Sequence, residues 1–127
     1  MTSKKCFVAI LAGMLFLISC SVQMFYIYGK DKIIFIDKYL AKKLKPESLS
    51  FRIIPDKTTE VQFTLRNISN KVLNFSYQMK FFDKNDFEIS YPNLHWEPAI
   101  IYPHQSLSLK KILPDNRAYR VVIYIKK

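Results

Sequence analysis

The chain has 127 residues, half of them hydrophobic and 15% aromatic, which allows one domain with a modest core and excludes a disordered composition. Its formal charge is +10, and removing Lys4 and Lys5 with the signal segment described below lowers the charge to about +8. The basic residues are scattered without a block of like charges, which indicates solvated faces rather than a nucleic-acid site. Cys6 and Cys20 are the two cysteines, and since Cys6 lies inside the signal segment, an internal disulfide and a cysteine-based metal site are both excluded.

The N-terminal segment has the pattern of a bacterial lipoprotein signal. Two lysines precede an apolar run over residues 6–18, as in a secretory signal peptide. The run closes on Leu17-Ile18-Ser19-Cys20, which resembles the bacterial lipobox: an aliphatic residue, two tolerated residues of which the second is small, and a cysteine. The resemblance implies a diacylglyceryl lipid on the Cys20 thiol, palmitate-type acylation and cleavage before this residue. We therefore expect a signal peptide at 1–19, followed by a lipidated cysteine and tether at 20–31.

An uncleaved anchor is the alternative reading of this segment. A helix over residues 6–28 would be long enough to span a bilayer, and the two lysines would hold its N-terminus inside. Both readings place the domain on the same side of the membrane. Ser21 follows Cys20 in place of the aspartate that typically retains lipoproteins at the inner membrane. In a Gram-negative host, we therefore expect the periplasmic face of the outer membrane.

The segment between Cys20 and residue 49 is predicted to contain one strand and one short helix. Residues 21–31 form a tether or an early strand, and residues 33–36 form a strand. Asp37 caps one or two helical turns that run through Lys45 and stop before Pro46, with an extended segment as the alternative.

From residue 49 onward, apolar and polar residues alternate with the period of two that is typical of half-buried strands. The predicted strands are 49–53, 61–65, 73–81, 87–91, 99–102, 106–113 and 118–126. Clusters of Pro, Asp and Asn separate them. About seven or eight short strands predict a single all-β domain over residues 32–127, folded as a two-sheet antiparallel sandwich. We expect the final strand, 118–125, to lie at a sheet edge.

The C-terminal two-thirds of the chain resembles the YcfL-type family of small periplasmic lipoproteins of unknown function. The residues that carry the resemblance are turn and strand signatures at 65–67 (LRN), 81–85 (FFDKN), 101–106 (IYPHQS) and 120–125 (RVVIYI). It implies an immunoglobulin-like β-sandwich in the cell envelope. No activity, cofactor or ligand comes with it.

The sequence contains no recognisable catalytic or metal-binding set. His95 and His104 are the only histidines, and a ligand or catalytic role would need partners at a suitable spacing. His104 lies between a proline and a predicted strand start, which indicates a turn role, and His95 neighbours Trp96 and Glu97. Asp83 and Asp86 flank a turn cluster without the glycine bend and oxygen ligands of a calcium loop. We therefore expect no enzyme activity, no metal and no cofactor.

The loop region over residues 91–102 is the strongest candidate for partner contact, because it combines aromatic side chains with three prolines. Its candidate contact residues are Tyr91, His95, Trp96 and Tyr102. The alternative for Trp96 is that it folds back and fills one end of the sandwich.

These observations predict a non-enzymatic docking or structural module in the bacterial envelope, anchored to the membrane through Cys20. The expected partner is an envelope protein or the cell wall, and nucleic acid is not expected. The alternative is a small-ligand-binding protein or an enzyme that uses residues 91–102. A deep pocket with convergent polar groups would favour this alternative, whereas a filled core would favour docking.

Overall fold

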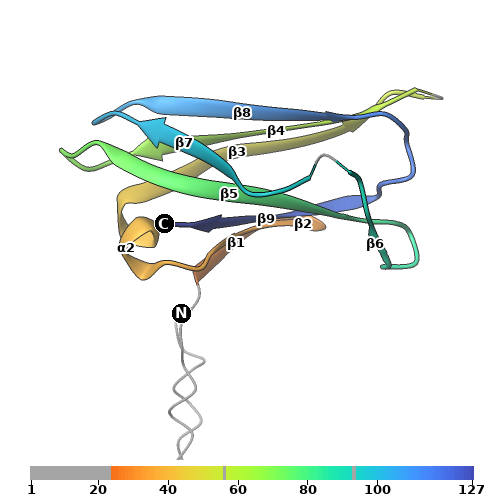
Figure 1. Ribbon diagram of the computed structural model, residues 1–127, viewed down its shortest axis with the longest axis horizontal. Helices are drawn as coiled ribbons and strands as arrows, with labels where there is room; N and C mark the ends of the chain where they lie inside the picture. Colours follow the sequence, from red (N-terminus) through yellow and green to blue (C-terminus); the bar gives the residue numbers. More distant parts are fainter. Residues whose placement is uncertain (1–23, 56, 93) are drawn as a thin grey trace, which may run out of the picture.

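The protein folds as a two-sheet β-sandwich with one short helix (Figure 1). The computed structural model describes residues 24–55, 57–92 and 94–127. In chain order the elements are β1 (Met24–Tyr28), β2 (Asp31–Phe35), α2 (Lys38–Lys43), β3 (Leu44–Ile53), β4 (Thr59–Asn67), β5 (Leu73–Phe82), β6 (Glu88–Ile89), β7 (Glu97–Ile101), β8 (Ser106–Leu113) and β9 (Arg120–Lys126). The predicted all-β sandwich is confirmed.

The two sheets differ in size and in strand order. The larger sheet has the order β1-β2-β9-β5-β6, and β7 pairs with the same edge of β5 as β6, nearer its start. The smaller sheet has the order β3-β4-β8 and is antiparallel throughout. One pair, β2 with β9, is parallel, which departs from the expected antiparallel arrangement. Parallel neighbours need a long crossover, and here the rest of the domain lies between the two strands.

The core lies between the two sheets and is built from the alternating residues of their central strands. In β4 and β5 the inward positions are buried, while the positions between them are exposed or half-buried. Phe63 of β4 contacts Tyr77 of β5 edge to face, with ring centroids 5.6 Å apart. Burial of such large side chains supplies most of the stabilisation of a domain of this size.

Helix α2 closes one end of the sandwich and has the predicted cap. The Asp37 carboxylate accepts a hydrogen bond from the Tyr39 backbone N–H at 2.8 Å, as an N-cap residue does. Leu40 points into the core, and the helix passes at Leu44 directly into β3. Pro46 therefore lies within an edge strand, next to a register irregularity, rather than at the helix stop.

Asn67 is a fully buried polar residue that ties three segments together at the same end. Its amide nitrogen donates to the Lys71 carbonyl at 2.7 Å and to the Ile101 carbonyl at 3.2 Å. Its side-chain oxygen accepts from the backbone N–H and the hydroxyl of Ser69. Because buried carbonyls are costly to leave unpaired, this residue fixes the β4–β5 connection against β7. Asn67 belongs to the resemblance motif, and the structure gives it an architectural role.

Two expectations about the ends of the chain need correction. Residues 24–28, expected within the tether at 20–31, form β1 and pair with β2 through a turn at Gly29, whose φ of +63° suits glycine. The early-strand alternative is therefore correct for this part. The final strand β9 is not at an edge, because β2 and β5 occupy both its sides. Its inward residues are apolar and fully buried, which a central position explains.

We expect Phe63→Ala to lower the free energy of unfolding by about 3–5 kcal/mol, because it leaves a cavity between the sheets and removes the contact with Tyr77. Urea denaturation followed by circular dichroism measures the change. The control is Ile112→Ala, on the outer face of β8 and 57% exposed, which we expect to change stability by about 0.5 kcal/mol or less. Equal losses in the two variants would contradict the assignment of the core.

Candidate functional site

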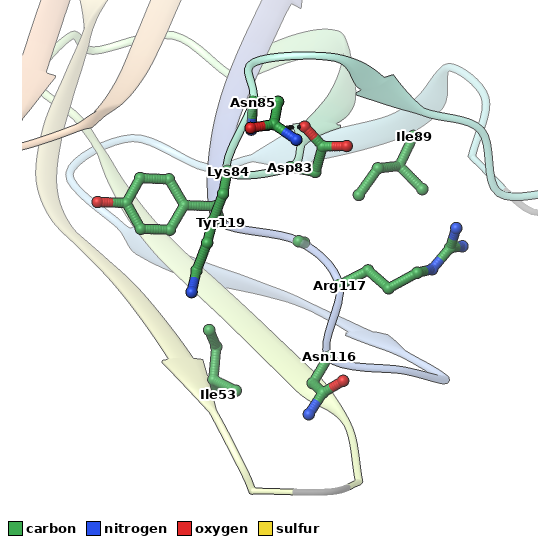
Figure 2. A pocket seen from close by; sticks show the side chains of 9 residues that line it. Ile53, Asp83, Lys84, Asn85, Ile89, Asn116, Arg117 and Tyr119 are labelled. Atoms are coloured by element: carbon green, nitrogen blue, oxygen red, sulfur yellow. Dashed lines mark hydrogen bonds between the residues drawn. The ribbon is translucent and has the colours of Figure 1, made fainter.

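A surface hollow of about 360 Å³ opens at the end of the sandwich opposite α2 (Figure 2). We call this end the loop end; it comprises the β1–β2, β3–β4, β5–β6 and β8–β9 connections. The residues that line the hollow are Ile53, Asp83, Lys84, Asn85, Ile89, Asn116, Arg117, Ala118 and Tyr119. They come from the β5–β6 and β8–β9 connections and from the ends of β3 and β6, so the hollow exists only when both sheets are assembled.

Large apolar side chains are exposed around the hollow. Ile53 and Tyr119 line it and are each 42% exposed, and Phe87 in the neighbouring β5–β6 connection is 69% exposed. The Lys30 ammonium lies 5.2 Å from the centre of the Tyr119 ring, at a distance suited to a cation–π contact. Clustered apolar residues with a charged surround are typical of protein-contact surfaces.

The charged groups at the loop end are mostly paired. Arg120 binds Asp86 at 2.6 Å, and Arg117 binds Asp115 at 3.0 Å. Lys84 lies in the hollow lining and forms no ion pair with any residue that the structure describes. The ammonium of Lys84 is therefore a cation that the hollow can offer to a carboxylate of a partner.

Asp115 braces the β8–β9 connection that forms one wall of the hollow. Its carboxylate accepts a hydrogen bond from the Tyr91 hydroxyl at 2.7 Å, and its carbonyl accepts from the Thr59 hydroxyl at 2.9 Å. Burial acts to raise the pKa of Asp115, but hydrogen bonds from Tyr91 and Arg117 hold it below its usual value. Burial and the adjacent carboxylate raise the pKa of Tyr91 to about 12, so this phenol stays protonated and donates. The wall is thus held in place before any partner binds.

A second carboxylate, Asp31, is buried beneath the loop end. It accepts a hydrogen bond from the Val121 backbone N–H at 2.9 Å, which links the start of β2 to the start of β9. Burial raises its pKa, and the Val121 bond with the charges of Lys30 and Arg120 offsets only part of this effect. Asp31 therefore positions the two parallel strands at some cost in stability when it is ionised.

We expect Asp31→Asn to gain stability relative to the wild type as the pH rises from about 4 to about 7. Because the pKa is raised on folding, the folded protein retains this proton to higher pH than the unfolded chain. The resulting contribution to stability is present at low pH and is lost as the pH rises through the folded pKa. The asparagine oxygen can still accept the Val121 bond without a charge. Urea unfolding across this pH range measures the difference, and Glu88→Gln, at an exposed position, controls for the loss of one charge. If the difference in unfolding free energy between Asp31→Asn and the wild type did not change with pH, this account of Asp31 would be overturned.

The structure does not gather the four predicted contact residues of the 91–102 region into one patch. Tyr91 is buried against Phe81, with ring centroids 6.0 Å apart, so little of its ring is accessible to a partner. Trp96, the residue before β7, is half-buried, and the Lys126 ammonium lies 4.2 Å from its ring centre. His95 is exposed beside it. Tyr102 is exposed but lies at the α2 end, after β7.

The hollow next to residues 88–94 has a volume of about 80 Å³, far below the roughly 300 Å³ at which small-molecule sites begin. His104 occupies a turn, with φ of +60°, and its ring bonds the Asn70 side chain at 2.9 Å, which matches its expected turn role. Over residues 24–55, 57–92 and 94–127, no three His, Cys, Asp or Glu side chains are grouped as metal ligands would be. Cys20, the predicted lipidation site, lies outside the described residues.

Sequence reasoning did not identify the hollow at the loop end. The turn clusters at 55–57, 83–86 and 114–116 are visible in the sequence, and the structure places connections there. What the sequence does not show is that these three connections meet at one end, because that depends on which strands pair within each sheet and on how the two sheets pack.

The chain belongs to the family described as "Protein of unknown function (DUF1425)", whose model matches residues 31–127. Two solved structures are similar. One is a DUF1425 family member from Shewanella sp. pv-4, with a TM-score of 0.60 and 13% identity, covering 86% of this chain and 92% of that one. The other is cj0090 from Campylobacter jejuni, with a TM-score of 0.60 and 23% identity, covering 74% of this chain and 95% of that one. At these identities the likeness concerns the fold alone. The search of curated proteins finds no match.

Proposed function

We propose that this protein is a lipid-anchored, non-enzymatic envelope protein that docks a partner protein with its loop end. The proposed location in the cell envelope rests on the Leu17-Ile18-Ser19-Cys20 lipobox and on the resemblance to YcfL-type periplasmic lipoproteins. Ser21 in place of a retention aspartate supports the periplasmic face of the outer membrane. Among the described residues, no helix is long and apolar enough to cross a membrane.

The shape of the loop end is the observation that carries the docking role. The core between the sheets is filled with buried side chains, and the hollow at the loop end lies open at the surface rather than inside the sandwich. Its rim exposes Ile53 and Tyr119, while its walls are braced through Asp115. Such a preorganised apolar surface suits a partner's side chains better than it suits catalysis or a small polar ligand.

The charges around the hollow indicate the chemistry of the partner. Apolar Ile53, Ile89 and Ala118 line the hollow together with Lys84, whose ammonium forms no ion pair among the described residues. A protein segment that presents an apolar side chain next to a carboxylate would satisfy both parts of this lining. The cell wall is the competing partner, since its peptide stems also carry carboxylates.

We expect Cys20→Ser to abolish palmitate labelling and to leave the signal peptide uncleaved, because both steps of lipoprotein maturation depend on the thiol of this residue. Metabolic labelling and gel mobility of the full-length chain measure the two effects. Ser19→Ala, which keeps a small residue before the cysteine, is the matched control and should mature normally. Normal processing and labelling of the Cys20→Ser protein would refute the anchor.

We expect a photo-reactive amino acid at Asn116, in the lining of the hollow, to crosslink the anchored protein to one discrete partner in intact cells. The same group at His95 tests the 91–102 region, and at Ser108, on the outer face of β8, it serves as a background control. Lys84→Glu should weaken the Asn116 crosslink at least several-fold, because it reverses the charge of a side chain that lines the hollow. Crosslinks confined to His95 would move the site to the 91–102 region. Binding of the purified protein to isolated cell wall that Lys84→Glu also weakens would replace the protein partner by the wall.

A further inference from the structure

We propose that the α2 end of the sandwich lies against the anionic headgroups of the membrane that holds the N-terminal segment, so that the loop end faces away from that membrane. The α2 end comprises helix α2, the β4–β5 connection and the β7–β8 connection (Figure 1). The inference rests on the proposed membrane anchor, but it concerns a different surface from the docking hollow.

A cluster of lysines without acidic partners covers the α2 end. Its members are Lys38, Lys42, Lys43, Lys45, Lys71 and Lys127, all exposed except the half-buried Lys43. In the part of the chain that the structure describes, none of them lies within 4.0 Å of a carboxylate. The ion pairs of the described residues are formed instead by Lys30, Arg52, Lys110, Lys111, Arg117 and Arg120.

The acidic residues are distributed in the opposite way. Among the described carboxylates, Asp37 and Glu47 are those of the α2 end. Asp37 is occupied as the cap of α2, and Glu47 accepts a hydrogen bond from the Ser106 hydroxyl at 2.8 Å. The other described carboxylates lie along the strands or at the loop end. The molecule therefore has a strongly basic end, which favours an anionic surface.

The same end exposes the residue types that lie at a lipid interface. Tyr39 is on α2 between two ammonium groups, with Lys43 5.6 Å and Lys127 5.4 Å from its ring centre. Ile68 and Val72 of the adjacent β4–β5 connection are also exposed. An aromatic ring flanked by lysines and aliphatic side chains can settle among headgroups while the ammonium groups bind phosphates.

The length of the linking chain brings this end to the membrane. Four residues lead from Cys20 to Met24 at the start of β1, and they span at most about 14 Å. Met24 pairs with Phe35 at the end of β2, and the α2 cap follows two residues later. An anchor at Cys20 therefore holds α2, rather than the loop end, next to the bilayer.

The distance between the two ends makes the orientation depend on these lysines and not on net charge. The ten residues of β5 separate the ends by about 33 Å at roughly 3.3 Å per residue. Charges are screened over about 8 Å at physiological ionic strength. Lysines of the loop end, such as Lys57 and Lys84, then contribute almost nothing to contact when α2 faces the lipid.

The experiment uses the full chain isolated from membranes and reconstituted into vesicles of phosphatidylcholine with or without phosphatidylglycerol. A fluorescent amino acid is placed either at Asn74, in the hollow beside Tyr39 and Lys127, or at Asn85 in the loop end. A lipid with a nitroxide headgroup quenches nearby fluorescence. We expect phosphatidylglycerol to increase quenching at Asn74 but not at Asn85, and added salt to reverse the increase.

Two variants with the same loss of charge make the test specific. Lys42→Gln with Lys127→Gln should weaken the lipid contact by about fivefold for each lysine removed. Lys57→Gln with Lys84→Gln should leave quenching at Asn74 unchanged. The proposal would be overturned if the two double variants had equal effects, if quenching at Asn74 did not depend on phosphatidylglycerol, or if quenching were stronger at Asn85. Palmitate labelling of the same preparation reports on the anchor separately, so failure of the anchor and failure of the lipid contact give different results.

Discussion

The arrangement of this protein depends on the pairing of β9 with β2 on one side and β5 on the other. The inward side chains of β9, Val121, Ile123 and Ile125, are fully buried between the sheets. The parallel partner, β2, comes from the other end of the domain, so the N-terminal hairpin is held only once the C-terminal strand is in place. The buried Asp31 carboxylate marks this junction, because it bonds the backbone at the start of β9 and carries the burial cost described above.

This pairing gives the molecule two different ends. The start of β1, helix α2 and the end of β9 lie together, while the β3–β4, β5–β6 and β8–β9 connections meet at the opposite end. A cluster of six lysines outside the ion pairs of the described residues lies at the first end, and the hollow with its braced walls opens at the second. A small domain tethered next to its first strand can thus hold one surface at the membrane and present another to the space beyond it. This polarity links the proposed anchor, docking surface and lipid contact.

Membership of a family of unknown function supplies no reaction, and the two similar structures concern the fold alone. The functional inference therefore rests on surfaces. Polar networks elsewhere in the domain serve the architecture: Asn67 joins the β4–β5 connection to β7, and Glu97 of β7 joins the Tyr77 hydroxyl to Lys111 of β8 across the two sheets. Burial and the Glu97 carboxylate raise the pKa of Tyr77 to about 12, which keeps its hydroxyl a donor. The bonds of these groups join neighbouring strands and connections of the domain.

The sequence by itself determined the local elements, because alternation, caps and turn residues act over a few positions. It placed β8 at its observed bounds and the Asp37 cap at its observed position. Only the tertiary structure decided which strands are neighbours, since strand order depends on contacts between residues far apart in the chain. For this reason the sequence predicts β9 at an edge and groups Tyr91 with three other candidate contact residues, and it does not reveal the hollow around Tyr119. Turn signals mark where the chain reverses, but the packing of the two sheets determines which turns meet.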